Sequence, residues 1–271
     1  MYYRKFIPST HLLPFVECYF AWEKKEVLTQ SMCIESPPTG FASMVFNYGD
    51  GYYVDNNKYN ALLAPSSFLT GQATQSYTLN LSGHIGMVGI VFKPAGLSSL
   101  FGLPMYEFSD ERISLIDVLG NSFQFLHEQI QEAHAPVDRV RLLDQFLNRQ
   151  LLKKGNTFDR TDYVANAIVD RKGVVNVGEL MNDMYVCRRQ FERQFLQKVG
   201  VSPKYYARIR RIGYLCAQLA GQRWQVTDWH DLIYQCGYYD QSHFIRDFTQ
   251  FIGKRPSLYV KDNLELMNYL S

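Results

Sequence analysis

Hydrophobic and polar positions follow two different periods along this chain, and the change falls near residue 109. Before it, short apolar runs are separated by Gly, Pro and Asn, as at 43–54, 75–83 and 84–94. Alternation with a period of two is typical of β-strands, and Gly, Pro and Asn favour the turns between them. We therefore expect a hairpin at 43–54 and two further strands, the last one stopped by Pro94. Several short strands of this kind predict a small β barrel or sandwich.

After this point the apolar positions recur every three to four residues, which predicts helices. Residues 137–155 form the clearest such helix, because their leucines fall on one stripe. The polar stretch 154–162 is the best linker candidate, and the chain beyond it is expected to be helical. The predicted fold class is therefore α+β. A β domain with trailing helices is expected at 1–155, and an all-helical domain at 156–271.

One pattern occurs twice in the helical part. Residues 187–206 align without a gap on residues 240–259, at a constant offset of 53 positions, and 7 of the 20 aligned positions are identical. The identities include the Phe positions of the apolar face and the Gly, Pro and Tyr that follow it. Chance similarity between two amphipathic helices explains the Phe spacing but not the other identities. The pattern therefore predicts one supersecondary unit that is used twice.

Each copy has the layout of a helix-turn-helix unit, at about 176–200 and 227–253. A short helix, predicted at 177–184 in the first unit, precedes a second helix with a polar, Arg-bearing outer face. Asp240 is the expected N-cap of that second helix in the second unit. Such a face suits a DNA major groove, where Arg bonds guanine and Gln or Ser reaches base edges. Between the units, residues 203–221 predict one long connecting helix.

The charge of the chain is unevenly divided. The net charge is only +2, yet residues 171–261 hold 15 Lys and Arg against 7 Asp and Glu, a net +8, which leaves −6 for the rest. A compact basic segment on an acidic remainder favours an anionic partner for that segment alone. The alternative interpretation of a helix-turn-helix pattern is an ordinary solvated helix face. Two copies inside a basic segment argue against it.

The residues also resemble a known family. GYYDQSHFIRDFTQFIGKRPSLY, at 237–259, is similar to the signature of the AraC/XylS family of bacterial transcription regulators, and the resemblance covers roughly residues 162–260. In that family, two helix-turn-helix units joined by a long helix bind double-stranded DNA. The resemblance implies that the base-reading residues are Arg189, Glu192 and Arg193 in the first unit, and Gln241, Ser242, His243 and Arg246 in the second. Contacts with phosphate, which supply most of the affinity for DNA, are expected from Arg188, Lys204 and Lys254.

The first part of the chain has a resemblance of its own. Residues 36–51, 68–83 and 89–110 resemble a sensor-like β domain found ahead of this DNA-binding domain in some bacterial regulators, similar to the cupin-like arms of sugar-sensing members. The resemblance implies a regulatory or dimerising role. The expected partners are a small-molecule effector, a second copy of the chain and, for an activator, RNA polymerase. The alternative is an effector-independent DNA-binding protein whose N-terminal domain only dimerises or contacts a protein partner.

Other classes of function find little support. The six His residues form no HxH or HxxxH pair, and GIVFKPAG at 89–96 lacks the spacing of a phosphate-binding loop. We therefore expect no catalytic residue, no metal and no cofactor. The five Cys residues lack CxxC spacing and are expected to be free thiols. Without a signal-peptide pattern or a long apolar run, the chain is expected to act in the cytoplasm, at the nucleoid and away from membranes.

Overall fold

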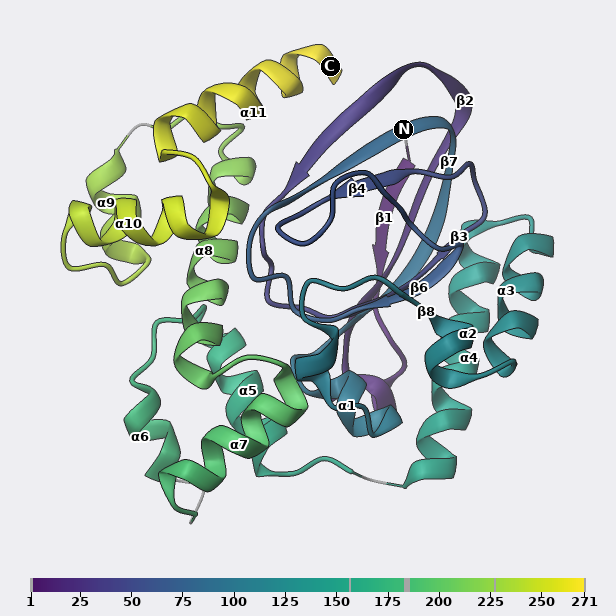
Figure 1. The fold of residues 1–271 in the computed structure, drawn as a ribbon, viewed down its shortest axis with the longest axis horizontal. Helices are drawn as coiled ribbons and strands as arrows, with labels where there is room; N and C mark the ends of the chain where they lie inside the picture. The colour runs from purple at the N-terminus through teal and green to yellow at the C-terminus, as the bar shows by residue number, and fades with distance from the viewer. Residues whose placement is uncertain (1, 156, 183–185, 227, 271) are drawn as a thin grey trace.

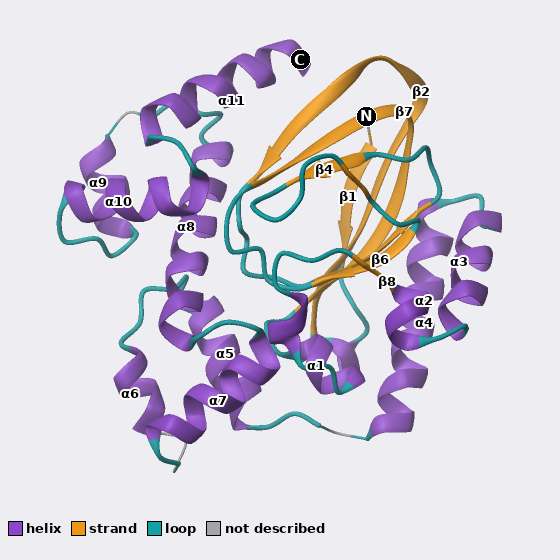
Figure 2. Cartoon of the chain, viewed as in Figure 1, coloured by secondary structure: helices purple, strands orange, loops and turns teal. Residues whose placement is uncertain are grey.

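The computed structural model describes residues 2–155, 157–182, 186–226 and 228–270 of the 271-residue chain. A β-rich part, formed by the first half of the chain, lies beside a helical part formed by the second half (Figure 1, Figure 2). This arrangement confirms the predicted α+β fold class. Within the described residues, no helix is long and apolar enough to cross a membrane.

The β part is one antiparallel sheet built around two long strands, β2 (Val16–Ser36) and β7 (Tyr77–Phe92). The main strand order is β1-β2-β7-β3-β6-β8, and β4, which also pairs with β5, pairs with the first half of β7 on the same edge as β3. The shorter strands are β1 (Tyr2–Phe6), β3 (Ser43–Asn47), β4 (Tyr53–Asp55), β5 (Leu62–Leu63), β6 (Ser67–Thr70) and β8 (Ile113–Ser114). Irregular pairing of β2 with β7 around Leu28 bends both strands, so the sheet folds over an apolar interior.

The hairpin predicted at 43–54 is wrong. β3 pairs with β6 and the second half of β7, whereas β4 pairs with β5 and the first half of β7. The Gly-Asp-Gly turn lies directly on β7, because the Asp50 N–H donates to the carbonyl of His84. A Cβ at Gly49 would come within 2.5 Å of the same carbonyl oxygen. The turn residues therefore connect β3, which pairs with the second half of β7, to β4, which pairs with the first half.

The two strands predicted at 75–83 and 84–94 are one continuous strand, β7. Gly83, at the expected boundary, has a φ of +68°, a conformation that L side chains rarely adopt. It pairs with Leu28, where β2 is itself irregular. The glycine therefore bends the strand and does not end it. The strand stops at Phe92, two residues before Pro94.

Helices cover the other face of this sheet, where a second apolar core contains Phe46, Val88 and Leu143. They are the 3-10 helices η1 (Thr10–Leu12) and η2 (Met105–Phe108) and the α-helices α1 (Gly96–Phe101), α2 (Leu115–Leu119), α3 (Ser122–Glu132) and α4 (Pro136–Lys154). α4 agrees with the helix predicted at 137–155. The boundary between domains, placed at about residue 155, stays a prediction.

The helical part contains two units joined by a long helix, as predicted. Its helices are α5 (Arg160–Asp170), α6 (Val177–Asn182), α7 (Arg188–Val199), α8 (Pro203–Gly221), α9 (Trp229–Gln235), α10 (Gln241–Ile252) and α11 (Pro256–Leu270). α8 matches the predicted connector at 203–221. The first helix of the first unit, predicted at 177–184, is described as far as Asn182, and residues 183–185 lie outside the described residues.

The second helices of the two units, α7 and α10, end in the same way. Gly200 and Gly253 follow them with φ of +96° and +83°, and the N–H of each bonds the carbonyl four residues back. Glycine adopts this left-handed conformation without strain, which explains its place in the repeat. Phe195 and Phe248 lie at equivalent positions, and both are fully buried in one shared core. The repeat in the sequence thus corresponds to a repeat in the structure, in both the glycine that ends the helix and the buried Phe.

Candidate nucleic-acid interface

The two units are held apart by α8 (Figure 1). With 19 residues, this helix is about 28 Å long. Successive major grooves on one face of B-DNA lie about 34 Å apart. The connector is therefore somewhat shorter than the spacing of two successive grooves on straight B-DNA.

The outer face of α7 is basic and open to solvent. Arg188, Arg189 and Arg193 are exposed, and Glu192 is half-exposed. The Nε of Arg188 donates to Glu192 over 2.9 Å, one turn further along the helix. Exposed pairs of this kind contribute only about 0.3–0.5 kcal/mol, so a phosphate can replace the carboxylate at little cost.

The outer face of α10 is polar and begins at its first residue. Gln241, Ser242 and Arg246 are exposed, and the Arg246 Nε makes only a long bond of 3.4 Å to the Ser242 carbonyl. His243 is half-buried, because its ring packs edge-on against Tyr238 at a centroid distance of 5.3 Å. Its Nε2 lies 3.8 Å from the carboxylate of Asp247. His243 therefore lies at the edge of the exposed face of α10, on the side of the helix that faces α8.

A buried ion pair, which the sequence analysis missed, joins α8 to α10. The Arg208 guanidinium lies 2.8 Å from Asp247, whose side chain is only 5% exposed. The Tyr238 hydroxyl donates to the same carboxylate over 3.4 Å. The hydrogen bond that Arg208 donates to Asp247 raises the pKa of Arg208, although burial opposes that rise. Asp247 lies between Phe244 and Phe248 on the apolar side of α10, and a charge in that position was the sequence signal for a buried partner.

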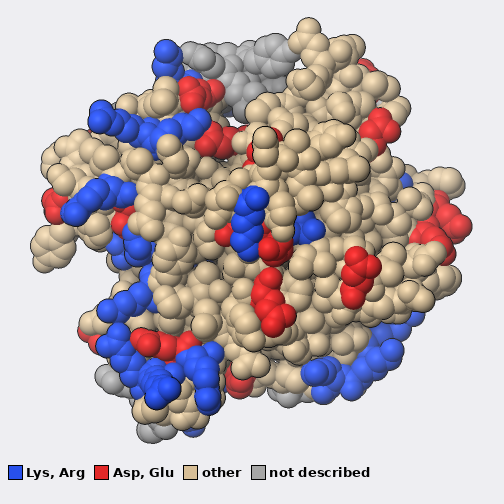
Figure 3. All heavy atoms as spheres, viewed as in Figure 1, with Lys and Arg blue, Asp and Glu red and all other residues tan. Residues whose placement is uncertain are grey.

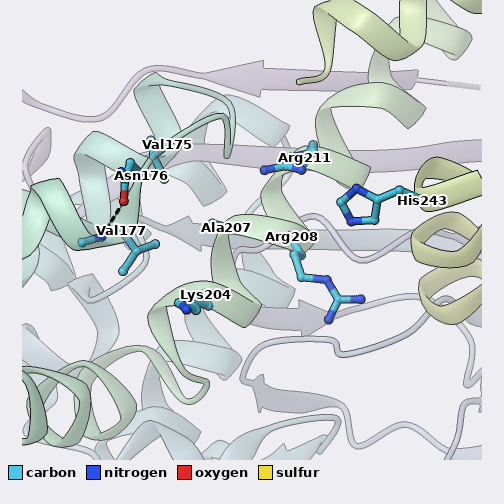
Figure 4. Close-up of a pocket in the computed structure, with 9 residues that line it drawn as sticks. Val175, Asn176, Val177, Lys204, Ala207, Arg208, Arg211 and His243 are labelled. Carbon is cyan, nitrogen blue, oxygen red and sulfur yellow. Dashed lines mark hydrogen bonds between the residues drawn. The ribbon is translucent and has the colours of Figure 1, made fainter. Parts of the chain in front are cut away.

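A groove of about 480 Å³ opens between the two units, along α8. Lys204, Arg208 and Arg211 line it at positions i, i+4 and i+7, which share one helix face. His243 closes one side from α10, and the start of α6 closes the other (Figure 4). None of the described residues that line the groove is acidic. The groove therefore offers positive charge between the two outer faces.

The opposite face of α8 is covered by the β part. The Tyr206 hydroxyl donates to the Gly40 carbonyl over 2.8 Å, and the Arg210 guanidinium donates to the Thr39 carbonyl. A Cβ at Gly213 would lie 2.9 Å from the Pro38 carbonyl oxygen. These three α8 residues are each about 200° around the helix from a residue that lines the groove. The β part therefore covers this face of α8 between Tyr206 and Gly213, whereas the groove side of the helix is open.

The β part also contacts the end of α7. Lys198, in the last turn, forms an ion pair of 2.7 Å with the buried Asp162 of α5, and its ammonium also donates to the Ser99 hydroxyl over 3.2 Å. The Ser109 hydroxyl donates to the Gly200 carbonyl over 3.1 Å. Both serines belong to the β part, so the first unit is attached to it at the end of its second helix.

The equivalent end of α10 is attached in a similar way. The Ser76 N–H donates to the Phe251 carbonyl over 2.8 Å. Lys254, just past the helix, pairs with Glu35 of β2 and with Asp262, each at 2.9 Å. Burial lowers the pKa of Lys254, but these two carboxylates outweigh it and raise that pKa above its usual value. Two carboxylates therefore compete with phosphate for the Lys254 ammonium.

In the view of Figure 3, Lys and Arg side chains are concentrated over the helices on the left, where α7, α8 and α10 lie in Figure 1. Two helix-turn-helix units on a basic helical part define the class of this protein as a DNA-binding transcription regulator. In the described residues, no group of three or more His, Cys, Asp or Glu side chains is arranged to hold a metal ion.

Comparison with known families supports that class. Residues 180–262 match the family described as a helix-turn-helix domain, and residues 4–114 match a domain of unknown function, DUF6597. The C-terminal domain is an AraC-type helix-turn-helix domain. No curated protein matches the sequence.

Several solved structures are similar over most of the chain. A structure of ToxT from Vibrio cholerae at 1.65 Å is 12% identical, covers 89% of this chain and 97% of its own, and has a TM-score of 0.46. ToxT from Vibrio cholerae bound to an unsaturated fatty acid is 14% identical, with coverage of 88% and 96% and a TM-score of 0.44. The AraC-like transcriptional activator CuxR is 12% identical, with coverage of 81% and 96% and a TM-score of 0.29.

Proposed function

We propose that this protein is a sequence-specific transcription regulator that inserts α7 and α10 into successive major grooves, under the control of its β part. The observation that carries the proposal is the covering of one face of α8 by the β part. It leaves a single basic side, bounded by the outer faces of α7 and α10, for the approach of DNA.

In this proposal, base edges are read by exposed side chains of the two helices. Arg193 and Arg246 have the same position in the two units, and a guanidinium bonds guanine through two atoms. The full proposed set is Arg189, Glu192 and Arg193 in the first unit, and Gln241, Ser242, His243 and Arg246 in the second. Phosphate contacts come from Arg188, Lys204 and Lys254, and Arg211 adds positive charge in the groove between the units.

The β part is the proposed regulatory element. It contacts the ends of α7 and α10, and it contacts α8 between Tyr206 and Gly213, so a shift of the β part changes the relative placement of both reading helices. Lys254 would exchange between Glu35 and a DNA phosphate during such a shift. A small molecule that binds one arrangement more tightly moves the equilibrium towards it. A second copy of the chain and, for an activator, RNA polymerase are the proposed protein partners.

Selection of binding sites from random duplex DNA, with the full chain and over a salt series, tests the proposal. We expect two enriched half-motifs about 10 base pairs apart and an affinity that falls steeply with salt. The selection is repeated with Gly213→Ala, in which the contact of α8 with the β part is loosened. If the β part holds the wild-type protein inactive, this variant should still select a motif. No enriched motif in either selection would contradict sequence-specific reading.

A further inference from the structure

The helices α7 and α10 occupy the same stretch of the repeat. α7 spans Arg188–Val199 and α10 spans Gln241–Ile252, so their first residues and their last residues are each separated by the offset of 53 positions. Both helices start after a residue in extended conformation and end at a glycine in left-handed conformation. A given position of the repeat therefore has the same height and the same direction on both helices.

One position of the repeat differs in chemistry between the two helices. It holds Glu192 in α7 and Ile245 in α10, in each case just before the arginine that the two helices share. Both residues are half-exposed, and each is the fifth residue of its helix. The N-terminal residues of a reading helix are those that contact base edges. A carboxylate and an apolar side chain therefore occupy equivalent places in the part of each helix that enters the groove.

Ile245 lies on the flank of α10 that faces away from α8. At about 100° per residue, it is about 200° around the helix from His243, which lines the groove beside α8. The exposed side chains of Ser242 and Arg246 lie between these two flanks. Ile245 is therefore an apolar residue at the edge of the reading face.

An apolar hollow continues from Ile245 into the second unit. It has a volume of about 420 Å³ and lies between α9, α10 and the start of α11. Its apolar walls are Trp229, Ile233, Phe244, Ile245 and Pro256. Ile245 packs against the core that the two units share, while part of its side chain stays accessible. The core thus holds an apolar surface in a fixed place beside the reading face.

Glu192 offers the opposite chemistry at the same place on α7. Its side chain is 45% exposed, and its carboxylate accepts a hydrogen bond of 2.9 Å from the Nε of Arg188. A DNA phosphate that pairs with Arg188 leaves this carboxylate free to accept a hydrogen bond from a base. The first unit therefore carries an acceptor where the second unit carries an apolar group.

The major groove presents different groups to these two side chains. Thymine offers its C5-methyl group and a carbonyl acceptor, and cytosine offers an amino donor. An isoleucine removes the methyl group from water, but against an amino group it would leave a donor without a partner. A carboxylate accepts from the amino group and is repelled by the thymine carbonyl.

We propose that Ile245 reads the C5-methyl group of a thymine in one half-motif, and that Glu192 reads the amino group of a cytosine at the equivalent place in the other; the inference rests on the proposed function. Arg193 and Arg246 bond a guanine in both half-motifs. The half-motifs then share this guanine and differ at one position within about two base pairs of it. That difference fixes which half-motif each unit binds.

Replacement of thymine by uracil tests the methyl contact, because it removes the methyl group and keeps every hydrogen-bonding group. Duplexes carry the selected operator with uracil at each thymine in turn, and the half-motif that loses its guanine preference in Arg246→Ala is the one bound by α10. At one thymine of that half-motif, uracil should raise the Kd of the full chain about threefold to fivefold, the effect of one buried methyl group.

Two variants show whether Ile245 causes this effect. Ile245→Ala should bind the uracil duplex and the unmodified operator equally well. Leu196→Ala shortens an exposed apolar side chain of α7 by a similar amount and should keep the uracil effect in the half-motif of α10. Melting temperatures of both variants show that they are folded.

Exchange of the two side chains tests the position itself. Ile245→Glu should change the preferred base in the half-motif of α10 from thymine to cytosine. Glu192→Ile should change the other half-motif from cytosine to thymine. Each change should alter the ratio of the two Kd values at least about fivefold. A gained preference cannot come from an unfolded variant, so this exchange separates base reading from a loss of structure.

The outcomes separate this inference from the proposed function. Half-motifs with the same base at this position, uracil tolerated at every thymine, or a uracil effect that persists in Ile245→Ala would each overturn the inference and retain the sequence-specific regulator. Exchange variants that keep the wild-type preferences would do the same. A selection that enriches no motif would remove both.

Discussion

At the scale of single residues, the two reading helices carry one arginine in common. Arg193 and Arg246 are separated by the repeat offset of 53 positions, and both are exposed. Neither forms an ion pair with a described residue. A guanidinium held on a rigid helix without a competing carboxylate is available for a base edge.

We therefore expect Arg193→Ala and Arg246→Ala each to reduce the free energy of specific DNA binding by about 1–3 kcal/mol and to relax one base preference. Binding isotherms on the selected operator and on a scrambled duplex measure the effect. Lys204→Ala is the matched control, because loss of a phosphate contact should weaken both duplexes and lower the salt slope by about 1. An equal loss on both duplexes in the arginine variants would contradict base reading.

His127 of α3 supplies a pH dependence at the same scale. Its ring stacks on Phe46 at 6.2 Å, it is 9% exposed, and neither ring nitrogen has a partner among the described residues. Burial lowers the pKa of His127, and the adjacent Glu128 opposes this shift only in part. The folded state therefore holds the neutral ring, and the unfolded state binds the extra proton first.

The free energy of unfolding should accordingly fall as the pH drops through about 6.5, the usual pKa of an unfolded histidine. Urea unfolding between pH 8 and pH 5.5 measures this dependence. His127→Leu should flatten it, and His134→Leu, at an exposed position, should not. An unchanged slope in His127→Leu would show that other groups cause the dependence.

At the scale of elements, the two units share one hydrophobic core. Phe195 of α7, Phe248 of α10 and Leu215 of α8 all belong to the same cluster of buried side chains. The repeat alone suggests two units that fold separately. A shared core instead couples both units to the connecting helix, so each depends on the packing of the other.

Phe195→Ala and Phe248→Ala should each lower the free energy of unfolding by about 3–5 kcal/mol, because each leaves a cavity where a large side chain was fully buried. Urea unfolding, followed by circular dichroism at helix wavelengths, gives the value. Thr249→Ala, at an exposed position next to Phe248, should change it by less than about 0.5 kcal/mol. Loss of helix signal from only one unit, with the other intact, would contradict the shared core.

At the scale of the whole molecule, the β part contacts α7, α8 and α10 at once. The contact with α8 is close, because a Cβ at Gly213 would lie 2.9 Å from the Pro38 carbonyl oxygen. On the same helix, a Cβ at Gly221 would meet nothing within 4 Å. The two glycines therefore form a natural pair of test and control positions.

Gly213→Ala should loosen the attachment of the β part, whereas Gly221→Ala should leave it intact and stabilise α8 by up to about 1 kcal/mol. Amide hydrogen exchange of Ser76, whose N–H bonds the Phe251 carbonyl, reports the attachment. We expect faster exchange and a changed affinity for DNA in Gly213→Ala alone. If both variants exchange like the wild type, α8 does not control the attachment.

The sequence by itself determined the helices of the two units, their caps, the connector at 203–221 and the exposed faces that carry Arg193 and Arg246. Helices can be predicted in this way because their hydrogen bonds and side-chain contacts join residues three or four positions apart. The fold class followed from the same local periods. The base-reading and phosphate-contacting residues, and the domain boundary, stay predictions.

Only the tertiary structure decided which strands pair and which charges meet. The hairpin at 43–54 was mispredicted because β3 and β4 pair with different halves of β7, and nothing within those residues encodes that choice. The same holds for the pairing of Arg208 with Asp247 and for the pairing of Lys254 with Glu35. Strand pairing and buried ion pairs join residues that are far apart in the chain, so they are specified by the packing of the whole molecule and not by any local period.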